Sequence, residues 1–146
     1  MLIKDVMTPH PACCNPNDTI DTVAKLMLEH DCGEIPVCDG NALIGVVTDR
    51  DITCRAVATG KPVLTVPVRD VMTRNVYSVE QDQKIEAALD LMEEKMVRRL
   101  PVVNQMGMIT GIISLADIIA KARMLKVALM MRSLAKRTRR YGVALT

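Results

Sequence analysis

The stretch Gly45–Ile52, GVVTDRDI, returns later in the chain as Gly111–Ile118, GIISLADI. In both copies a short apolar run, typical of a β-strand, ends at a hydroxyl residue, and an aspartate follows three positions later. Other segments of the chain match one another at nearly the same offset and in the same order. A repeat of this length indicates a fold built from two similar units.

Further matches give the outline of each unit. The segment KDVMT at 4–8 returns as RDVMT at 69–73, and Pro-Val at 36–37 returns at 101–102. Each unit reads as β-α-β-β-α: an extended opening segment, an amphipathic helix, a hairpin and a second helix. A unit of about 60 residues buries little surface alone. We therefore expect an α+β fold in which the two units pack sheet to sheet about a pseudo-twofold axis. The expected helix caps are Asn17, Asp18 and Asp82.

The charge distribution separates the end of the chain from its body. Residues 1–117 carry 11 Lys and Arg against 17 Asp and Glu, a net charge of −6, whereas residues 118–146 carry eight Lys and Arg and no acid. An apolar stripe in this basic helix predicts packing against another subunit, and so a homodimer. The alternative is contact with nucleic acid, an anionic membrane surface or an acidic partner. The expected segments are repeat one at 1–60, a linker at 61–68, repeat two at 69–122 and a basic amphipathic C-terminal helix at 123–146.

The composition limits the class of protein. Hydrophobic residues make up 49% of the chain and aromatic residues 1%, so many of the 11 methionines are expected in the core. Five cysteines, an odd number without a CxxC pair, predict reduced thiols and a cytoplasmic protein. The N-terminus lacks the apolar region of a signal peptide, and no run approaches the roughly 18 apolar residues of a membrane span.

No catalytic motif stands out, so we expect a protein that is not an enzyme. The two histidines lie in no HExxH arrangement, and neither a GxSxG nor a phosphate-binding GK[ST] loop is present. Both histidines and most of the cysteines do gather between His10 and Cys38, which leaves a thiol or metal sensor as an alternative. Their spacing is irregular, and buried inert cysteines explain them equally well. We predict no metal site.

The motifs DVMT, hydrophobic-Pro-Val and G-h-h-[ST]-x-x-D, each present twice and in order, resemble those of the CBS domain. Two in tandem resemble the CBS pair, or Bateman module, over residues 4 to about 120. The phrases VTDRDI and MEEKMVRRLPVV are similar to small stand-alone CBS-pair proteins of bacteria and archaea. The resemblance implies a non-catalytic regulatory module that signals to a partner. Its ligand would be AMP, ADP, ATP or S-adenosylmethionine, bound between the repeats.

The repeated phrase supplies chemistry suited to such a ligand. Asp51 and Asp117 each follow a strand end, and one carboxylate can accept hydrogen bonds from both hydroxyls of a ribose. Thr48 and Ser114 lie three residues earlier, where backbone N–H groups at a helix start favour a phosphate. The alternative is purely structural, with the hydroxyls capping helices and the aspartates in the first turn.

The resemblance extends the site to the segments that open each repeat. It implies that Thr8 and Thr73 contact base or ribose, and that the opening segment of one repeat crosses to the other. Thr8 should then face Ser114 and Asp117, and Thr73 should face Thr48 and Asp51. An apolar slot for adenine would be lined by Val6, Met7, Val71 and Met72. A role for the threonines in turns is the alternative.

Basic residues distinguish the two repeats. Arg98 and Arg99 stand before LPVV in repeat two, at a position where the resemblance implies contact with ligand phosphate. Repeat one has Gly33 and Glu34 there, so we expect inequivalent sites, one of them suited to phosphate. Arg50 within VTDRDI is a further phosphate candidate. Solvation, or pairing of the Arg98–Arg99 pair with Glu93 and Glu94, is the alternative.

Overall fold

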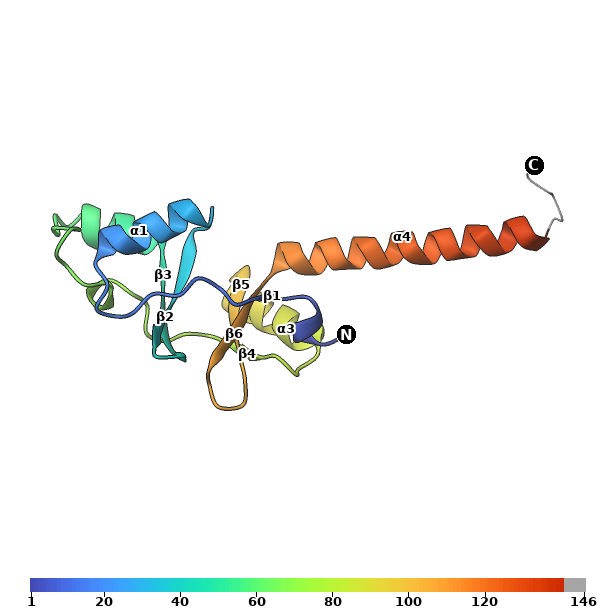
Figure 1. The fold of residues 1–146 in the computed structure, drawn as a ribbon, viewed down its shortest axis with the longest axis horizontal. Coiled ribbons are helices and arrows are strands. Elements are labelled where there is room, and N and C mark those ends of the chain that lie inside the picture. Colours follow the sequence, from blue (N-terminus) through green and yellow to red (C-terminus); the bar gives the residue numbers. More distant parts are fainter. Residues whose placement is uncertain (141–146) are drawn as a thin grey trace.

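The computed structural model describes residues 1–140 and confirms an α+β fold of two similar halves followed by a C-terminal helix (Figure 1). In chain order the elements are η1 (Ile3–Asp5), β1 (Thr8–Pro9), α1 (Ile20–Glu29), β2 (Glu34–Asp39), β3 (Ala42–Thr48), α2 (Asp49–Asp51), η2 (Ile52–Val57), η3 (Val68–Asp70), β4 (Val79–Glu80), α3 (Ile85–Lys95), β5 (Arg99–Val103), β6 (Ile109–Ser114) and α4 (Leu115–Arg140).

The two halves repeat one strand arrangement. In the second half four strands run in the order β1-β6-β5-β4, with β4 parallel to β5 and the other pairs antiparallel. In the first half β2 and β3 form the central hairpin. Single bridges extend it on both sides, Cys14 beside Val37 and Thr73 beside Val46. These bridges occupy the places that β4 and β1 hold in the second half.

A local pseudo-twofold axis relates the halves where their hairpin turns meet. Leu43 N donates to Gly107 O at 3.3 Å, and Ile109 N donates to Asn41 O at 2.9 Å. The second bond is the first with the halves exchanged, because positions 41 and 43 correspond to positions 107 and 109 in the repeat. The reciprocal bonds place the two hairpins side by side in the middle of the molecule.

The opening segment of each repeat belongs in space to the other half. Ile3 is fully buried in the core of the second half, and its backbone N–H donates to Gln83 O at 2.9 Å. Val68, Val71 and Met72 are buried in the core of the first half. Residues 63 and 66 also pack there, so the chain between the repeats lies on the first half rather than free in solvent. The crossing explains how two small units share one stable fold.

Gly45 and Gly111 are required where the crossing segments pass over the hairpins. A Cβ at Gly111 would lie 2.9 Å from the carbonyl oxygen of Thr8, and one at Gly45 would lie 2.9 Å from that of Thr73. Both distances are shorter than real Cβ contacts. The glycine that opens each copy of the repeated phrase is therefore explained by close backbone packing.

The predicted helix caps, residues 17, 18 and 82, were wrong. Helix α1 begins after Thr19 and α3 after Lys84, and neither N-cap side chain accepts a capping bond. Asp18 instead accepts a backbone bond at 2.9 Å within the turn before α1, and Asp82 pairs with Lys4 at 2.7 Å. These acids organise the turns before the helices rather than the helix ends.

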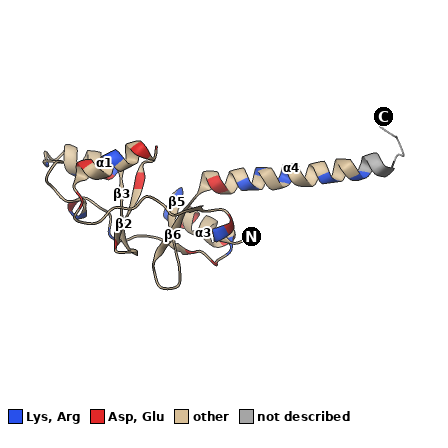
Figure 2. Ribbon diagram, viewed as in Figure 1, with Lys and Arg blue, Asp and Glu red and all other residues tan. Residues whose placement is uncertain are grey.

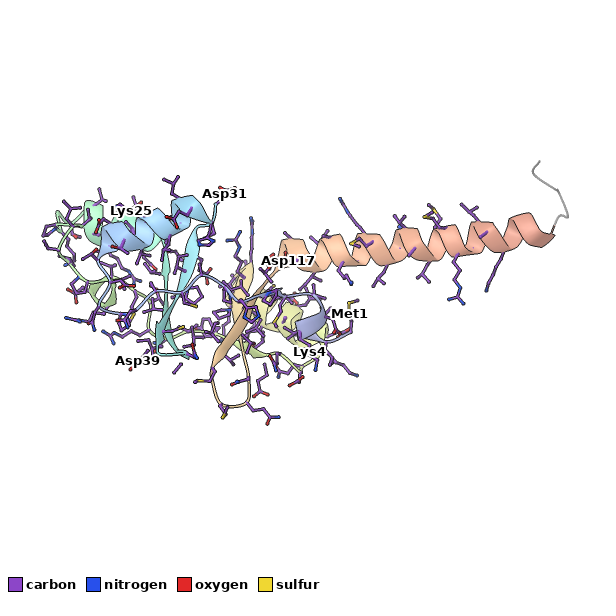
Figure 3. The ribbon with its side chains drawn as sticks, in the orientation of Figure 1. Met1, Lys4, Lys25, Asp31, Asp39 and Asp117 are labelled. Carbon is purple, nitrogen blue, oxygen red and sulfur yellow. The ribbon has the colours of Figure 1, made fainter. Side chains whose placement is uncertain are left out.

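Helix α4 extends alone from the body (Figure 1), and the charged residues along it are mostly Lys and Arg (Figure 2). Asp117 marks its start beside the second half (Figure 3). Ile118 is buried in the core, but Met124 and Leu129 are 66% and 65% exposed. Within residues 1–140, none of the helices combines the length and the apolar character that a membrane span needs. Residues 141–146 of the predicted tail lie outside the described residues.

Candidate functional site

The second copy of the repeated phrase forms a closed capping box at the start of α4. Ser114 Oγ accepts a bond from Asp117 N at 3.1 Å, while Asp117 Oδ2 accepts from Ser114 N at 3.0 Å and from Ser114 Oγ at 2.7 Å. Among the described residues, no group bonds to Asp117 Oδ1. One carboxylate oxygen thus fixes the turn, and the other is available to a ligand.

The first copy of the repeated phrase forms the same capping box, and an arginine side chain lies next to it. Thr48 Oγ1 accepts from Asp51 N at 3.0 Å, and Asp51 Oδ2 accepts from Thr48 N at 3.0 Å. Arg55 Nε lies 3.7 Å from Asp51 Oδ1. The hydroxyls therefore cap the helix starts in both copies, and the outer carboxylate oxygen of Asp117 is less engaged than that of Asp51.

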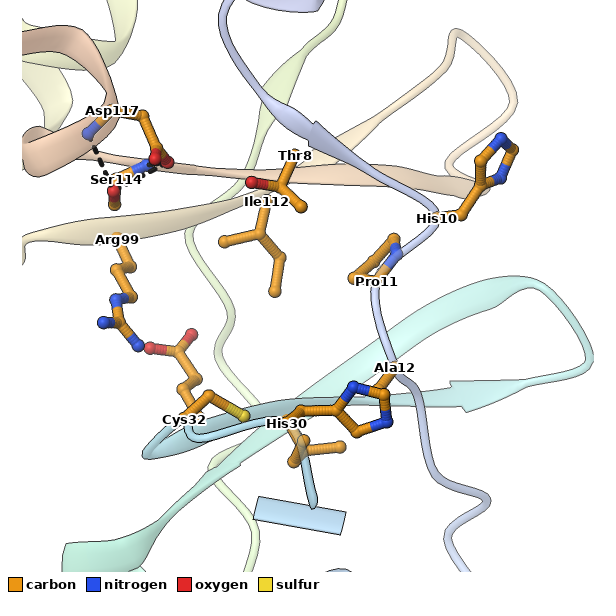
Figure 4. A pocket seen from close by; sticks show the side chains of 12 residues that line it. Thr8, His10, Pro11, Ala12, His30, Cys32, Arg99, Ile112, Ser114 and Asp117 are labelled. Atoms are coloured by element: carbon orange, nitrogen blue, oxygen red, sulfur yellow. Dashed lines mark hydrogen bonds between the residues drawn. The ribbon is translucent and has the colours of Figure 1, made fainter. Parts of the chain in front are cut away.

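The Ser114 pocket is a cavity of about 340 Å³ between the halves. Thr8, on the crossing strand β1, lines it together with Ser114 and Asp117, as expected (Figure 4). Arg99 extends across it from β5 toward the first half. Its other lining residues are His10, Pro11, Ala12, His30, Cys32, Glu34, Ile35 and Ile112. Such a volume is within the range of small-molecule sites.

The Thr48 pocket is the related cavity, with a volume of about 470 Å³. Thr73, on the other crossing segment, lines it beside Thr48, and its Oγ1 lies 3.5 Å from Asp51 Oδ2. Arg98 and Arg99 also line it, so Arg98 faces the motif of the opposite repeat. The remaining lining residues are Glu34, Val46, Asn75, Val76, Tyr77, Val97 and Leu100.

Glu34 and Arg99 occupy equivalent positions at the starts of β2 and β5, and both line both pockets. Burial raises the pKa of Glu34 above its ordinary value, the positive charge of Arg99 opposes this rise, and the negative charge of Asp51 adds to it. A repeat position that carries opposite charges in its two copies thus sits between the cavities. A bound phosphate would be attracted by Arg99 and repelled by ionised Glu34.

Arg55 is a residue that the sequence interpretation missed. It lies on the π-helix η2, and its Nη1 donates to Val71 O at 3.1 Å and approaches Thr73 Oγ1 at 3.3 Å. One guanidinium therefore connects Asp51 to the crossing segment. The spacing Asp51-x-x-x-Arg55 is an ordinary i,i+4 ion pair and gave no sign of the contact with residues 71–73.

Several predicted residues lie away from the two pockets. Val71 and Met72 are buried in the core of the first half, and Val6 and Met7 pack against the core of the second. Arg50 is exposed and lines neither pocket. Apolar pocket walls come instead from Ile35, Ile112, Val46, Val76 and Leu100.

A family model described as "CBS domain" matches residues 3–56 and 68–123. The chain belongs to the CBS domain family. The matched ranges cover both halves described above, so the molecule is a CBS pair followed by the extension of α4. "CBS domain-containing protein YhcV" of Bacillus subtilis (strain 168) is 40% identical over 116 residues, which cover 80% of this chain and 81% of that protein.

Solved CBS structures share the fold of this pair. Hypoxic Response Protein I with two coordinated zinc ions has a TM-score of 0.76 at 33% identity, covering 82% of this chain and 98% of that one. CBSX2 in complex with AMP has a TM-score of 0.74 at 28% identity, covering 86% and 98%. The CBS pair of MJ0100 with 5-methylthioadenosine and S-adenosyl-L-methionine has a TM-score of 0.73 at 26% identity, covering 88% and 98%.

Metal-competent side chains do not converge in this CBS pair. His10, His30 and Cys32 all line the Ser114 pocket. Yet among the residues that the structure describes, no group of three or more His, Cys, Asp or Glu side chains is placed to hold a metal ion.

Proposed function

We propose that this CBS pair is a non-catalytic cytoplasmic sensor that binds an adenosine-containing ligand between its halves and signals its occupancy to a partner protein. Structural neighbours contain AMP in one case, and S-adenosyl-L-methionine with 5-methylthioadenosine in another. Each ligand has an adenine, a ribose and a variable 5′ group. The proposal for this chain is the same class: AMP, ADP, ATP or S-adenosylmethionine.

The observation that carries the proposal is the convergence at the Ser114 pocket. A carboxylate with one free oxygen, Asp117, meets a threonine from the opposite repeat, Thr8, at an apolar-walled cavity. The free Oδ1 of Asp117 can accept bonds from a ribose diol, and bonds to a charged acceptor are about twice as strong as neutral ones. Ile112 and Ile35 offer apolar surface for a base.

The Thr48 pocket differs in the charge that it offers. Arg98 lines the Thr48 pocket but not the Ser114 pocket, and Arg99 lines both. The Thr48 pocket therefore offers more positive charge and is better suited to a ligand with phosphates. Asp51 is not among the residues that line this pocket, and its outer oxygen is close to Arg55, so a ribose that approached Asp51 would compete with that guanidinium. We therefore propose inequivalent sites, with the Thr48 pocket selecting for 5′ phosphate and the Ser114 pocket for the ribose diol.

Occupancy must change the protein in order to regulate a partner. A ligand shifts a conformational equilibrium only through different affinities for the two states. The crossing segments are suited to transmit ligand binding. Thr8 and Thr73 each line a pocket, and each lies on a segment that packs against the core of the other repeat. Closing a pocket would draw its threonine toward the aspartate and move the halves about the hairpin turns at residues 41–43 and 107–109.

We also propose a homodimer that uses helix faces, α4 included. Exposed apolar side chains on this helix include Met124, Leu125, Val127, Leu129, Met130 and Met131. A helix with apolar residues on several faces is normally covered.

The second candidate function is nucleic-acid binding or scaffolding through α4. It is favoured by the eight Lys and Arg residues, with no Asp or Glu, that follow residue 117.

A thermal-shift panel of AMP, ADP, ATP and S-adenosylmethionine tests the ligand class. Binding stabilises the native state by mass action, so a ligand at 100 times its Kd adds about 2.7 kcal/mol. The matched variants are Asp117→Asn and Asp51→Asn, because an amide oxygen keeps the capping bond and removes the charge. Asp117→Asn should reduce affinity at its pocket about 10- to 100-fold. No shift with any of the four ligands would contradict the proposed function.

A further inference from the structure

Two thiols from distant parts of the sequence meet outside the ligand pockets. The side chains of Cys13 and Cys38 hydrogen-bond to each other. Cys13 lies in the segment that follows the crossing strand β1, and its Sγ also donates to Pro11 O at 3.3 Å. Cys38 lies near the end of β2. Both are free thiols, and the sequence pattern gave no reason to pair them.

The backbone fixes this encounter on both sides. Cys14 N donates to Pro36 O at 3.0 Å, and Cys38 N donates to Cys14 O at 2.9 Å. Cys14 and Val37 form a parallel bridge, and both side chains are buried in the core of the first half. The side chains of Cys13 and Cys38, one residue before and one residue after this bridge, therefore lie on the opposite face of the same pair of segments. The backbone bonds hold the two segments side by side there, and the two thiols interact across them.

The two thiols differ in reactivity. A hydrogen bond from the Cys38 thiol lowers the pKa of Cys13, although burial opposes this change. The same hydrogen bond, together with burial, raises the pKa of Cys38. Cys13 is half-buried and Cys38 is buried, so an oxidant reaches Cys13 first. Burial raises the pKa of the adjacent Cys14 thiol to about 12, which keeps it protonated and unreactive.

We propose that Cys13 and Cys38 form a reversible intrachain disulfide and are a redox modification site of this protein. With hydrogen peroxide as oxidant, the Cys13 thiolate attacks one peroxide oxygen. The O–O bond breaks and gives a sulfenic acid and a hydroxide ion, which takes up the proton that Cys13 released on ionising and becomes water. The Cys38 sulfur then attacks the Cys13 sulfur, the S–O bond breaks, and hydroxide leaves with the Cys38 proton as water. Two thiols and one peroxide give one disulfide and two waters.

The cross-link would act on the segment that borders the Ser114 pocket. Pro11 and Ala12 line that pocket just before Cys13, and Ile35 lines it from the strand that carries Cys38. A disulfide would hold these two walls at a fixed separation. This consequence rests on the proposed function, whereas formation of the disulfide does not, and the two can be tested apart.

The test uses the full chain without any nucleotide, in a Cys32→Ser/Cys54→Ser background that leaves only Cys13, Cys14 and Cys38. After treatment with hydrogen peroxide and alkylation, mass spectrometry should find the peptide with Cys13 joined to the peptide with Cys38, and dithiothreitol should separate them. Cys13→Ser and Cys38→Ser should each abolish the link. Because closing a loop of about 25 residues constrains the unfolded chain, oxidation should raise Tm by several degrees.

Three results would overturn the proposal. The first is full alkylation of Cys13 and Cys38 after oxidation. The second is a link that survives Cys13→Ser, since Cys14 would then be the partner of Cys38. The third is a covalent dimer on a non-reducing gel, which would make the bond intermolecular. Failure of all nucleotides to bind, with the link still formed, would reject the proposed function and leave the redox site standing.

Discussion

Gly111→Ala tests whether close packing of the crossing strand holds the two halves together. The added Cβ would lie 2.9 Å from Thr8 O, and ordinary contact begins at 3.4 Å, so β1 must move away by that difference. The backbone cannot rotate away as a side chain can, and β1 has only two residues paired with β6. Overpacking of this kind costs about 1–3 kcal/mol. We expect Tm to fall by about 3–9 °C.

A matched control separates the backbone contact from a side-chain contact. The same Cβ would lie 2.5 Å from Met7 Sδ, which a flexible side chain can relieve. Thermal and urea denaturation of Gly111→Ala should therefore be repeated in a Met7→Ala background. The loss should persist there if Thr8 O is the obstacle. An unchanged Tm for Gly111→Ala, or complete rescue by Met7→Ala, would refute the reasoning. Nucleotide affinity should fall at the Ser114 pocket, because β1 carries Thr8.

Three further predictions concern charge and assembly. Arg98→Ala should weaken AMP binding about 10-fold by calorimetry and leave adenosine binding unchanged, whereas exposed Arg50→Ala should change neither; equal effects would remove Arg98 from the site. The raised pKa of Glu34 means that the folded state binds more protons than the unfolded state, so stability falls as pH rises above the ordinary value of 4.5. Glu34→Gln should flatten that slope in urea titrations, and an identical slope would reject the assignment. A chain that ends at residue 122 should be monomeric by light scattering, and a persistent dimer would exclude α4 from the interface.

The repeat allowed much of the fold to be predicted, because both copies of GVVTDRDI and its relatives follow strand and helix periodicity. The pairing of Thr8 with the Ser114 motif followed from the resemblance to the CBS pair, not from local pattern. Arg98 shows the limit: it shares a repeat with Asp117 but lines the pocket of Thr48. Which cavity a side chain enters depends on how the two halves pack, and spacing along the chain does not report it.

Other features depend on contacts between segments that are distant in sequence. Arg55, on the π-helix η2, reaches residues 71–73 because the second crossing segment lies beside that helix. Cys13 and Cys38 meet because Cys14 pairs with Val37 across the edge of a hairpin. The apolar slot expected at residues 71 and 72 is a site that the sequence predicted and the structure places elsewhere. Their hydrophobicity is equally consistent with a core, and the structure places them there.

The central claim is that the carboxylate of Asp117, in the second copy of the repeated phrase, binds the ribose of an adenosine ligand between the halves. The most direct measurement is calorimetric titration of the full chain with AMP and, in parallel, with its 2′,3′-dideoxy analogue. These ligands share base and phosphate and differ only in the two hydroxyls. We predict that AMP binds at least about 10-fold more tightly, the value of roughly one charge-assisted hydrogen bond. Equal affinities for the two ligands, or no heat from either, would contradict the account.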